Sequence, residues 1–418
     1  MSRRLAEKLA AVKPGSLYAG VDVALDRNYT MVINGQAEVL AQFHFPNDRD
    51  GYDYFYRRLG AAQERRQAPA VVVGMEPTNY FWKLLAADLE QHQKPYRLVN
   101  PFTVKKHREG DQLDRSKDDP RDAFTIADLL RTGKYTETRL LHGAYAELRQ
   151  YVTLHDRLER EIRRYKNLIR NTAGQLFPEL PQVFEDFSGA TARALFRSGP
   201  AAALLRDQSV EQFLRQVRAE FSGQRLQVSK LRCVYDLAAT SVGLRDATSA
   251  LQLSLRLFVE QLEKLEHQDE QVRLALTDTL LELPEAPYLL SVPAFGLLTA
   301  ATILAEIGDP RNYQRAAQLI KLAGTQPVPN TTGRKTRSKT PMSHKGRSRL
   351  RTTLFFAVLR LVQVDPVFAA SYEYYQQRVK DPLTKMQALG VLMNKLLRIL
   401  WALMKGQVFY NSALAQTA

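Results

Sequence analysis

Residues 17–45 read LYAGVDVALDRNYTMVINGQAEVLAQFHF, and this stretch sets the architecture of the N-terminal third of the chain. Apolar and polar residues alternate along it, which is the period of a half-buried β-strand. Asn34-Gly35 is a strong signal for a tight turn between two paired strands. The stretch therefore predicts the opening of a β-meander.

The sequence then changes from consecutive strands to alternating strands and helices. PAVVVGMEPT (69–78) is a continuous apolar run, which is typical of a strand buried on both faces of a sheet. A helical segment, YFWKLLAADLEQHQ (80–93), and a short strand, YRLVN (96–100), follow it. Strands followed by alternating helix and strand predict an α/β domain over residues 1–140.

The rest of the chain has helical periodicity. Two long amphipathic segments, 143–177 and 246–283, flank an insert around FPELPQVFEDFSG. They predict a coiled-coil or helical arm over 141–285, although ordinary bundle helices fit the pattern equally well. LLSVPAFGLLTAATILAEIGD (289–309) opens a mostly helical region, 286–418, with a helical hairpin. That hairpin is either a plain core element or a turn whose amides receive a phosphate. The predicted fold class is α/β plus all-α.

Charge indicates a polyanionic partner. The chain has 59 Lys and Arg against 44 Asp and Glu, which gives a net charge of +15. Nucleic acid is the first expectation and an anionic membrane surface the second. We find no apolar run approaching the ~20 residues of a membrane span and no signal-peptide core at the N-terminus. The single cysteine, Cys233, is expected to be a buried apolar residue, and it favours the reducing cytoplasm.

A basic segment near residue 340 is the strongest local signal for phosphate binding. Eight Lys or Arg residues and no acid lie between residues 334 and 351. Solvated charge runs usually contain both signs, so this one predicts contacts to a nucleic-acid backbone. The predicted contacts are Arg334, Lys335, Arg337, Lys339, Ser343, Lys345, Arg347, Arg349 and Arg351.

The acids in RSKDDPRDA (115–123) have two interpretations. Pro120 suits a first helical position, with Asp119 as the cap and Asp122 near the positive end of the helix dipole. Alternatively, residues at i and i+3 share a helix face, so Asp119 and Asp122 could present two carboxylates to one cation.

Two further acids belong to apolar strands: Asp22 is expected inside one, and Glu76 is expected to close another and precede a helix. Asp22 is in AGVDVAL and Glu76 is in VVVGMEPTN, where an uncompensated carboxylate would cost several kcal/mol. Each alone could be a paired structural acid or a strand-end cap. Together with Asp119 and Asp122, they place four carboxylates on three elements that meet at one sheet edge. Two Mg²⁺ ions ~3.5–4 Å apart need about that many carboxylates, so the set predicts a magnesium site.

These motifs carry a family resemblance. GVDVA, GMEPT and SKDDPRDA look like the acid motifs of the DEDD transposases of the insertion-sequence family numbered one hundred and ten, which are relatives of the pilin-gene inverting recombinases. The likeness continues through FPEL, LLSVPAFGLLTAATILAEIGD, NTTGRKTRSKTPMSHKGRSRLR and KMQALGVLMNKLLRILWAL, and so covers nearly the whole chain.

The resemblance implies an RNase H-like (RuvC-like) N-terminal domain akin to Holliday-junction resolvases, a coiled-coil dimerisation segment and a C-terminal transposase domain. It implies recombination of donor and target DNA by a dimer or tetramer, guided by a structured bridge RNA. Asp22, Glu76, Asp119 and Asp122 fall on the family's metal-binding acids. Asp118 falls on a position that is often Thr or Asn and is left out.

The resemblance also implies a serine nucleophile just before a glycine in the basic loop. Here the matching stretch is NTTG (330–333), so Thr332 takes the serine's place. A threonine hydroxyl can be a nucleophile, but its methyl group crowds the oxygen and stiffens χ1. Thr331, Ser338 and Ser343 are further hydroxyls in the same loop, and Ser343 also fits a turn or phosphate contact.

Three functions fit these features. The first is a metal-dependent DNA transposase that uses a loop hydroxyl. The second is a resolvase-like nuclease that activates water with the same metals. The third is a weakened relative that binds RNA or DNA without recombining it, because threonine replaces the family serine. Only the first predicts a covalent protein–DNA species.

Overall fold

The structure is a computed structural model, and it divides into two compact units, Met1–Leu140 and Leu141–Ala418. The described residues are 8, 10, 12–77, 79–111, 119–136, 140–221, 223, 225–246, 248–328, 331–332, 335–336 and 341–412. Each unit is considered by itself below.

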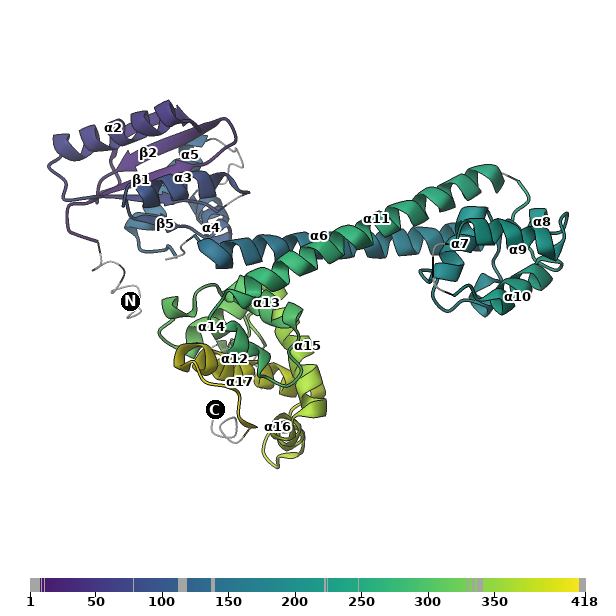
Figure 1. The fold of residues 1–418 in the computed structure, drawn as a ribbon. Helices are drawn as coiled ribbons and strands as arrows, with labels where there is room; N and C mark the ends of the chain where they lie inside the picture. The colour runs from purple at the N-terminus through teal and green to yellow at the C-terminus, as the bar shows by residue number, and fades with distance from the viewer. Residues whose placement is uncertain are drawn as a thin grey trace. The chain divides into compact units, whose positions relative to one another are not determined.

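A five-stranded sheet forms the centre of the first unit, with strand order β3-β2-β1-β4-β5 (Figure 1). Its strands are β1 (Leu17–Asp22), β2 (Arg27–Ile33), β3 (Val39–Pro46), β4 (Val71–Met75) and β5 (Tyr96–Leu98). β1 pairs antiparallel with β2 and parallel with β4, so the meander and the parallel half meet at β1. The predicted meander is confirmed, and the predicted α/β character of this part of the chain is confirmed with it.

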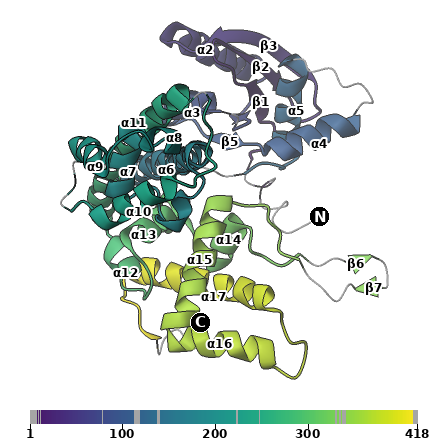
Figure 2. The same ribbon diagram turned by 90° about the vertical axis from the view of Figure 1, so that its right-hand side faces the viewer.

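Helices cover both faces of this sheet (Figures 1 and 2). They are α2 (Arg49–Arg65), α3 (Phe81–Gln91), α4 (Pro101–Asp111) and α5 (Asp119–Arg131). Phe55 of α2 and Leu85 of α3 pack on one face, in a cluster with Val21 and Met75 of the strands. α5 packs on the other face through Ala123 and other small residues. This mixed three-layer topology is consistent with an RNase H-like domain.

Two 34-residue helices, α6 (Gly143–Leu176) and α11 (Thr248–Leu281), pack along each other in the second unit (Figure 1). Between them in sequence lies a small helical insert with its own apolar core. The insert contains η1 (Leu180–Gln182), α7 (Ala190–Ser198), α8 (Ala202–Leu205), α9 (Val210–Ala219) and α10 (Val228–Ala238). The predicted pair of long helices with an insert is therefore present.

A second core of this unit joins the remaining helices to the start of α6 and the end of α11. Its elements are α12 (Ala286–Leu290), α13 (Leu297–Ile307), η2 (Pro310–Asn312), α14 (Ala316–Ala323), α15 (Ser348–Val364), α16 (Pro366–Gln377) and α17 (Lys385–Gly406). Residues 300–307 of α13 are all buried, as expected of the core-hairpin interpretation. A two-stranded hairpin, β6 (Thr331–Thr332) and β7 (Lys335–Thr336), lies between α14 and α15 (Figure 2).

Two expectations from sequence need correction. Cys233 is exposed on α10, because the buried stripe of that helix runs through Leu231 and Val234 instead. Helix α17 is long and apolar enough to cross a membrane by length and composition, and α15 and α16, bent by 101°, pass the same test as a pair. Half of the apolar stretch of α17 is buried inside the protein.

Candidate functional site

The sheet brings Asp22 and Glu76 to neighbouring strand ends. Asp22 is the last residue of β1, and Glu76 directly follows β4. Val21 pairs with Met75 in the parallel ladder, so the two acids take the next position on adjacent strands. Both are half-buried. Asp22 thus lies at a strand end, and not inside the strand as its apolar context suggested.

Two glycines allow helix α5 to approach this part of the sheet closely. A Cβ added to Gly20 would lie 2.1 Å from the carbonyl oxygen of Ala123 and 2.5 Å from the amide nitrogen of Ala127. One added to Gly74 would lie 2.4 Å from the side chain of Leu130. Because strand side chains alternate between faces, Asp22 and Glu76, two residues beyond these glycines, lie on the face that α5 covers.

The direction of α5 places its first turn toward the same edge. Arg131, at the end of α5, donates to the carbonyl of Gly35 in the β2–β3 turn, beside the beginning of β1. Helix α5 therefore runs antiparallel to β1 and begins toward its Asp22 end. Asp119 and Asp122 lie in that first turn; Asp122 is only 7% exposed, whereas Asp119 is exposed.

The donor chemistry of this edge fits magnesium better than a softer ion, because every candidate ligand is a carboxylate oxygen. Within the described ranges, however, no group of three or more His, Cys, Asp or Glu residues could hold a metal ion. Strand register places Asp22 beside Glu76, and α5 begins toward that edge with Asp119 and Asp122 in its first turn. Asp118 lies outside the described residues.

The third acid of α5, Asp128, has a different environment. Asp128 accepts hydrogen bonds from Arg131 at 2.6 Å and from His107 Nε2 at 2.9 Å. Burial alone would raise the pKa of Asp128, but the hydrogen bonds from Arg131 and His107 outweigh it and lower the pKa. Asp128 therefore belongs to a structural ion pair with Arg131, and no sequence motif pointed to it.

The basic loop is described only in part. Thr332 pairs with Lys335 across the β6–β7 hairpin, and the structure describes the backbone there. Three predicted phosphate contacts, Arg334, Arg337 and Lys339, and the spare hydroxyl Ser338 lie outside the described residues. The hydroxyl of Ser343 accepts a hydrogen bond from the Lys345 amide at 3.3 Å, so Ser343 has the turn role considered from sequence.

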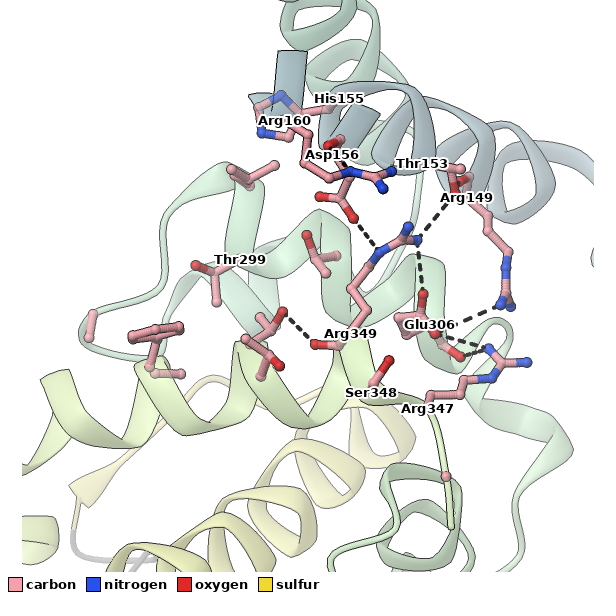
Figure 3. Close-up of a pocket in the computed structure, with 18 of the residues that line it drawn as sticks. Arg149, Thr153, His155, Asp156, Arg160, Thr299, Glu306, Arg347, Ser348 and Arg349 are labelled. Carbon is pink, nitrogen blue, oxygen red and sulfur yellow. Dashed lines mark hydrogen bonds and ion pairs between the residues drawn. The ribbon is translucent and has the colours of Figure 1, made fainter. Parts of the chain in front are cut away.

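The end of the basic segment is bound to protein groups. Arg347 and Arg349 both contact Glu306 of α13, at 3.7 and 3.1 Å, and Arg149 of α6 approaches the same carboxylate at 3.8 Å (Figure 3). Arg351 donates to the carbonyl of Ala323 at 2.9 Å. Sequence reasoning missed this arrangement because the acid lies about forty positions upstream in an apolar helix.

Comparisons with known proteins identify two family segments in the chain. Residues 19–178 match a family described as transposase, of the DEDD type found in IS110 elements. Residues 286–373 match the transposase family IS116/IS110/IS902. The first match contains the acid-bearing edge, and the second contains Glu306 and the basic loop. The chain is therefore an insertion-sequence transposase.

Relatives from three insertion elements share most of the length of the chain. A Streptomyces coelicolor protein named as a transposase of the IS117 mini-circle is 25% identical over 77% of this chain and 78% of its own length. An uncharacterized IS110 protein of the same organism is 29% identical over 71% of this chain and 73% of its own. An uncharacterized IS900 protein of Mycobacterium paratuberculosis is 24% identical over 96% of this chain and 99% of its own. With the two matched segments, these relatives place the chain in the IS110 family.

Proposed function

We propose that this protein recombines DNA in a magnesium-dependent reaction, with donor and target DNA selected by a structured guide RNA. The observation that carries the proposal is the register of β1 and β4, which sets Asp22 beside Glu76, together with the closely packed helix that begins with Asp119 and Asp122. The net charge of +15 supports a nucleic-acid partner.

Asp22, Glu76, Asp119 and Asp122 would hold the metal ions. When bound, Mg²⁺ supplies Lewis-acid polarisation of a phosphodiester and stabilises charge on its attacking and leaving oxygens. The carboxylates would fix the position of the ions against the strand. The exposed Asp119 and the buried Asp122 would be the outer and inner ligands from α5.

Thr332 would act as the nucleophile. Its Oγ–P bond forms while a P–O bond of the DNA strand breaks; the hydroxyl proton is lost and the leaving oxygen takes up a proton. Attack by the freed hydroxyl of another strand reverses these changes and joins the two strands. One phosphodiester is exchanged for another, so the cycle needs no external energy source.

The remaining basic residues would hold nucleic acid during this exchange. Lys345 is exposed and the basic loop extends from α14, so backbone phosphates would bind there by charge. We also propose that the protein works in the cytoplasm as a dimer or tetramer. The protomers would assemble through α6 and α11, because two 34-residue helices offer a long surface for contact with another copy.

The test is recombination in Mg²⁺ after co-expression with the flanking noncoding DNA, comparing wild type with Thr332→Ala and Thr332→Ser. We expect Thr332→Ala to abolish both strand exchange and a covalent protein–DNA species on denaturing gels, and Thr332→Ser to restore both. Cleavage without a covalent species would support the resolvase-like nuclease instead. Binding with neither reaction would identify a non-catalytic relative.

A further inference from the structure

An open pocket of about 1100 Å³ lies in the second unit, between α6, α13 and the beginning of α15. Five arginines and two carboxylates line it, together with several hydroxyl side chains (Figure 3). The arginines are Arg149, Arg160, Arg163, Arg347 and Arg349. Positive charge therefore exceeds negative charge on the walls of this hollow.

One wall is a stripe along α6. Arg149, Thr153, Asp156, Arg160 and Arg163 line the pocket at spacings of four, three, four and three residues, which keeps them on one face of the helix. The stripe spans about 21 Å at 1.5 Å per residue.

The arginines of the stripe differ in their partners. Arg349 bridges to Asp156 at 2.5 Å, and Glu306 is shared by three arginines. Arg160 has no carboxylate partner in the described part of the chain, and Arg163 meets Glu159 only at 4.0 Å while 72% exposed. The two outer arginines thus remain available to an anion.

A buried polar pair joins one wall of the pocket to α11. His155, which also lines the pocket, is buried and shares a 2.6 Å hydrogen bond with Asp269 of α11. Burial, reinforced by the nearby charges of Arg347 and Arg349, lowers the pKa of Arg149. An arginine remains protonated even so, and these like charges would be relieved by a bound phosphate.

The opposite wall offers an aromatic ring. Phe356 of α15 lines the pocket and is 61% exposed, so its ring is accessible to a ligand. Thr352 and Thr353 line the pocket one turn before it, so the ring continues the polar face of α15. Aromatic rings beside basic tracks are the stacking platforms that unpaired bases use.

We infer that this pocket binds a single-stranded segment of nucleic acid, with its phosphates along Arg160 and Arg163 of α6 and one unstacked base against Phe356. Single strands fit better than duplex, because a paired base cannot reach a ring inside a hollow while its phosphates follow one helix. The inference rests on the proposed function only for the class of ligand, and it adds a site that is separate from the acids and from Thr332.

The test measures binding of the full chain to fluorescein-labelled single-stranded RNA, single-stranded DNA and duplex DNA. Fluorescence anisotropy reports the affinity at each of a series of salt concentrations. We expect Arg160→Ala/Arg163→Ala to weaken single-strand binding at least tenfold and to lower the salt slope by about 1.4, for two lost phosphate contacts. Phe356→Ala should weaken it at least about fivefold with an unchanged salt slope.

The matched control is Lys264→Ala/Arg273→Ala, which removes two exposed charges from the neighbouring helix α11 outside the pocket. It should change affinity less than about twofold. Equal losses in the control and the pocket variant would show only a general charge effect and would overturn the site. Unchanged binding by Phe356→Ala would overturn the base contact.

A second readout locates the base directly. Oligonucleotides with 5-iodouracil should crosslink on irradiation to a peptide that contains Phe356, and crosslinks confined to other peptides would contradict the inference. RNA that binds much more tightly than DNA would identify the guide as the ligand, whereas the reverse would identify a displaced DNA strand. Asp22→Asn should bind as wild type does, so failure of the catalytic proposal would not alter this result.

Discussion

Asp22 in the first unit and Glu306 in the second are both acids in apolar segments, yet their surroundings differ. The elements that meet near Asp22 bring more carboxylates, Glu76 and Asp122, to the same edge. Those that meet at Glu306 bring three arginines, from α6 and the beginning of α15. The neighbours of an acid in an apolar run therefore decide how it is interpreted: three arginines make Glu306 a structural acid, whereas further carboxylates near Asp22 support the proposed cation site.

The largest expected effect separates these two roles. Asp22→Asn or Glu76→Gln should reduce strand exchange by more than a hundredfold. Each would remove a charged ligand from the proposed metal site, whose ions contact the reacting phosphodiester. Nucleic-acid affinity should stay within about threefold of wild type, and the thermal unfolding temperature should be unchanged. Recombination at the wild-type rate by either variant would show that the acid is structural.

Glu306→Gln should act through stability instead. The Glu306 side chain is only 4% exposed, and losing its charge leaves three arginines facing one another. Because those arginines are partly exposed, solvent screens their mutual repulsion. We therefore expect the free energy of unfolding to fall by about 3 kcal/mol. Hydrogen exchange should accelerate in peptides from α13 and the start of α15. Asp309→Asn is the control: its partner Arg311 is 79% exposed, and an asparagine oxygen can still accept the Arg311 backbone N–H, so exchange should change little.

Gly20→Ala should push helix α5 away from strand β1 near the acid-bearing edge. The new methyl group would meet the backbone of α5, and we expect a cost of about 2 to 3 kcal/mol with faster exchange in β1 and α5. Gly60→Ala in α2 is the matched control: nothing lies within 4 Å of an added Cβ there, so it should be neutral or stabilise by about 0.5 kcal/mol. Equal behaviour of the two variants would mean that α5 is not closely packed on β1.

The smallest effect concerns Asp128, the internally paired acid of the first unit. Its pKa is lowered in the folded protein, so its contribution to stability is present above the ordinary carboxyl pKa of about 4 and is lost as the pH falls through the folded pKa. Asp128→Asn should cost about 1 to 2 kcal/mol at pH 7 and progressively less below pH 4. Thermal melts from pH 3 to pH 7 would measure this, and a constant difference would contradict it.

Much of the fold could be predicted because its signals are local. The alternation of residues 17–45 and the apolar run before Glu76 predict the strands, and periodicity predicts α6 and α11. Burial of Cys233 was predicted wrongly, because residue type alone does not say which stripe of α10 faces the core. The pairing of Arg349 with Glu306 joins residues 43 positions apart, and no local pattern encodes it.

The candidate site shows the same division. Residue types and order pointed to Asp22, Glu76, Asp119 and Asp122, but only the strand register shows that the first two share an edge. The arginine stripe of α6 could have been found by its spacing of three and four residues. Its assignment as part of a binding pocket depends on residues of α15 that line the other side, and the sequence alone does not show that α15 lies there.

The most direct test of the acid-bearing edge is metal binding by the full chain in the absence of nucleic acid. A Mn²⁺ titration monitored by calorimetry and electron paramagnetic resonance should show saturable binding. That binding should be lost in Asp22→Asn/Glu76→Gln and kept in Asp128→Asn. Two ions held ~3.5–4 Å apart would add a spin-coupled signal. Unchanged Mn²⁺ binding by the double variant would contradict the claim that these carboxylates hold the metal.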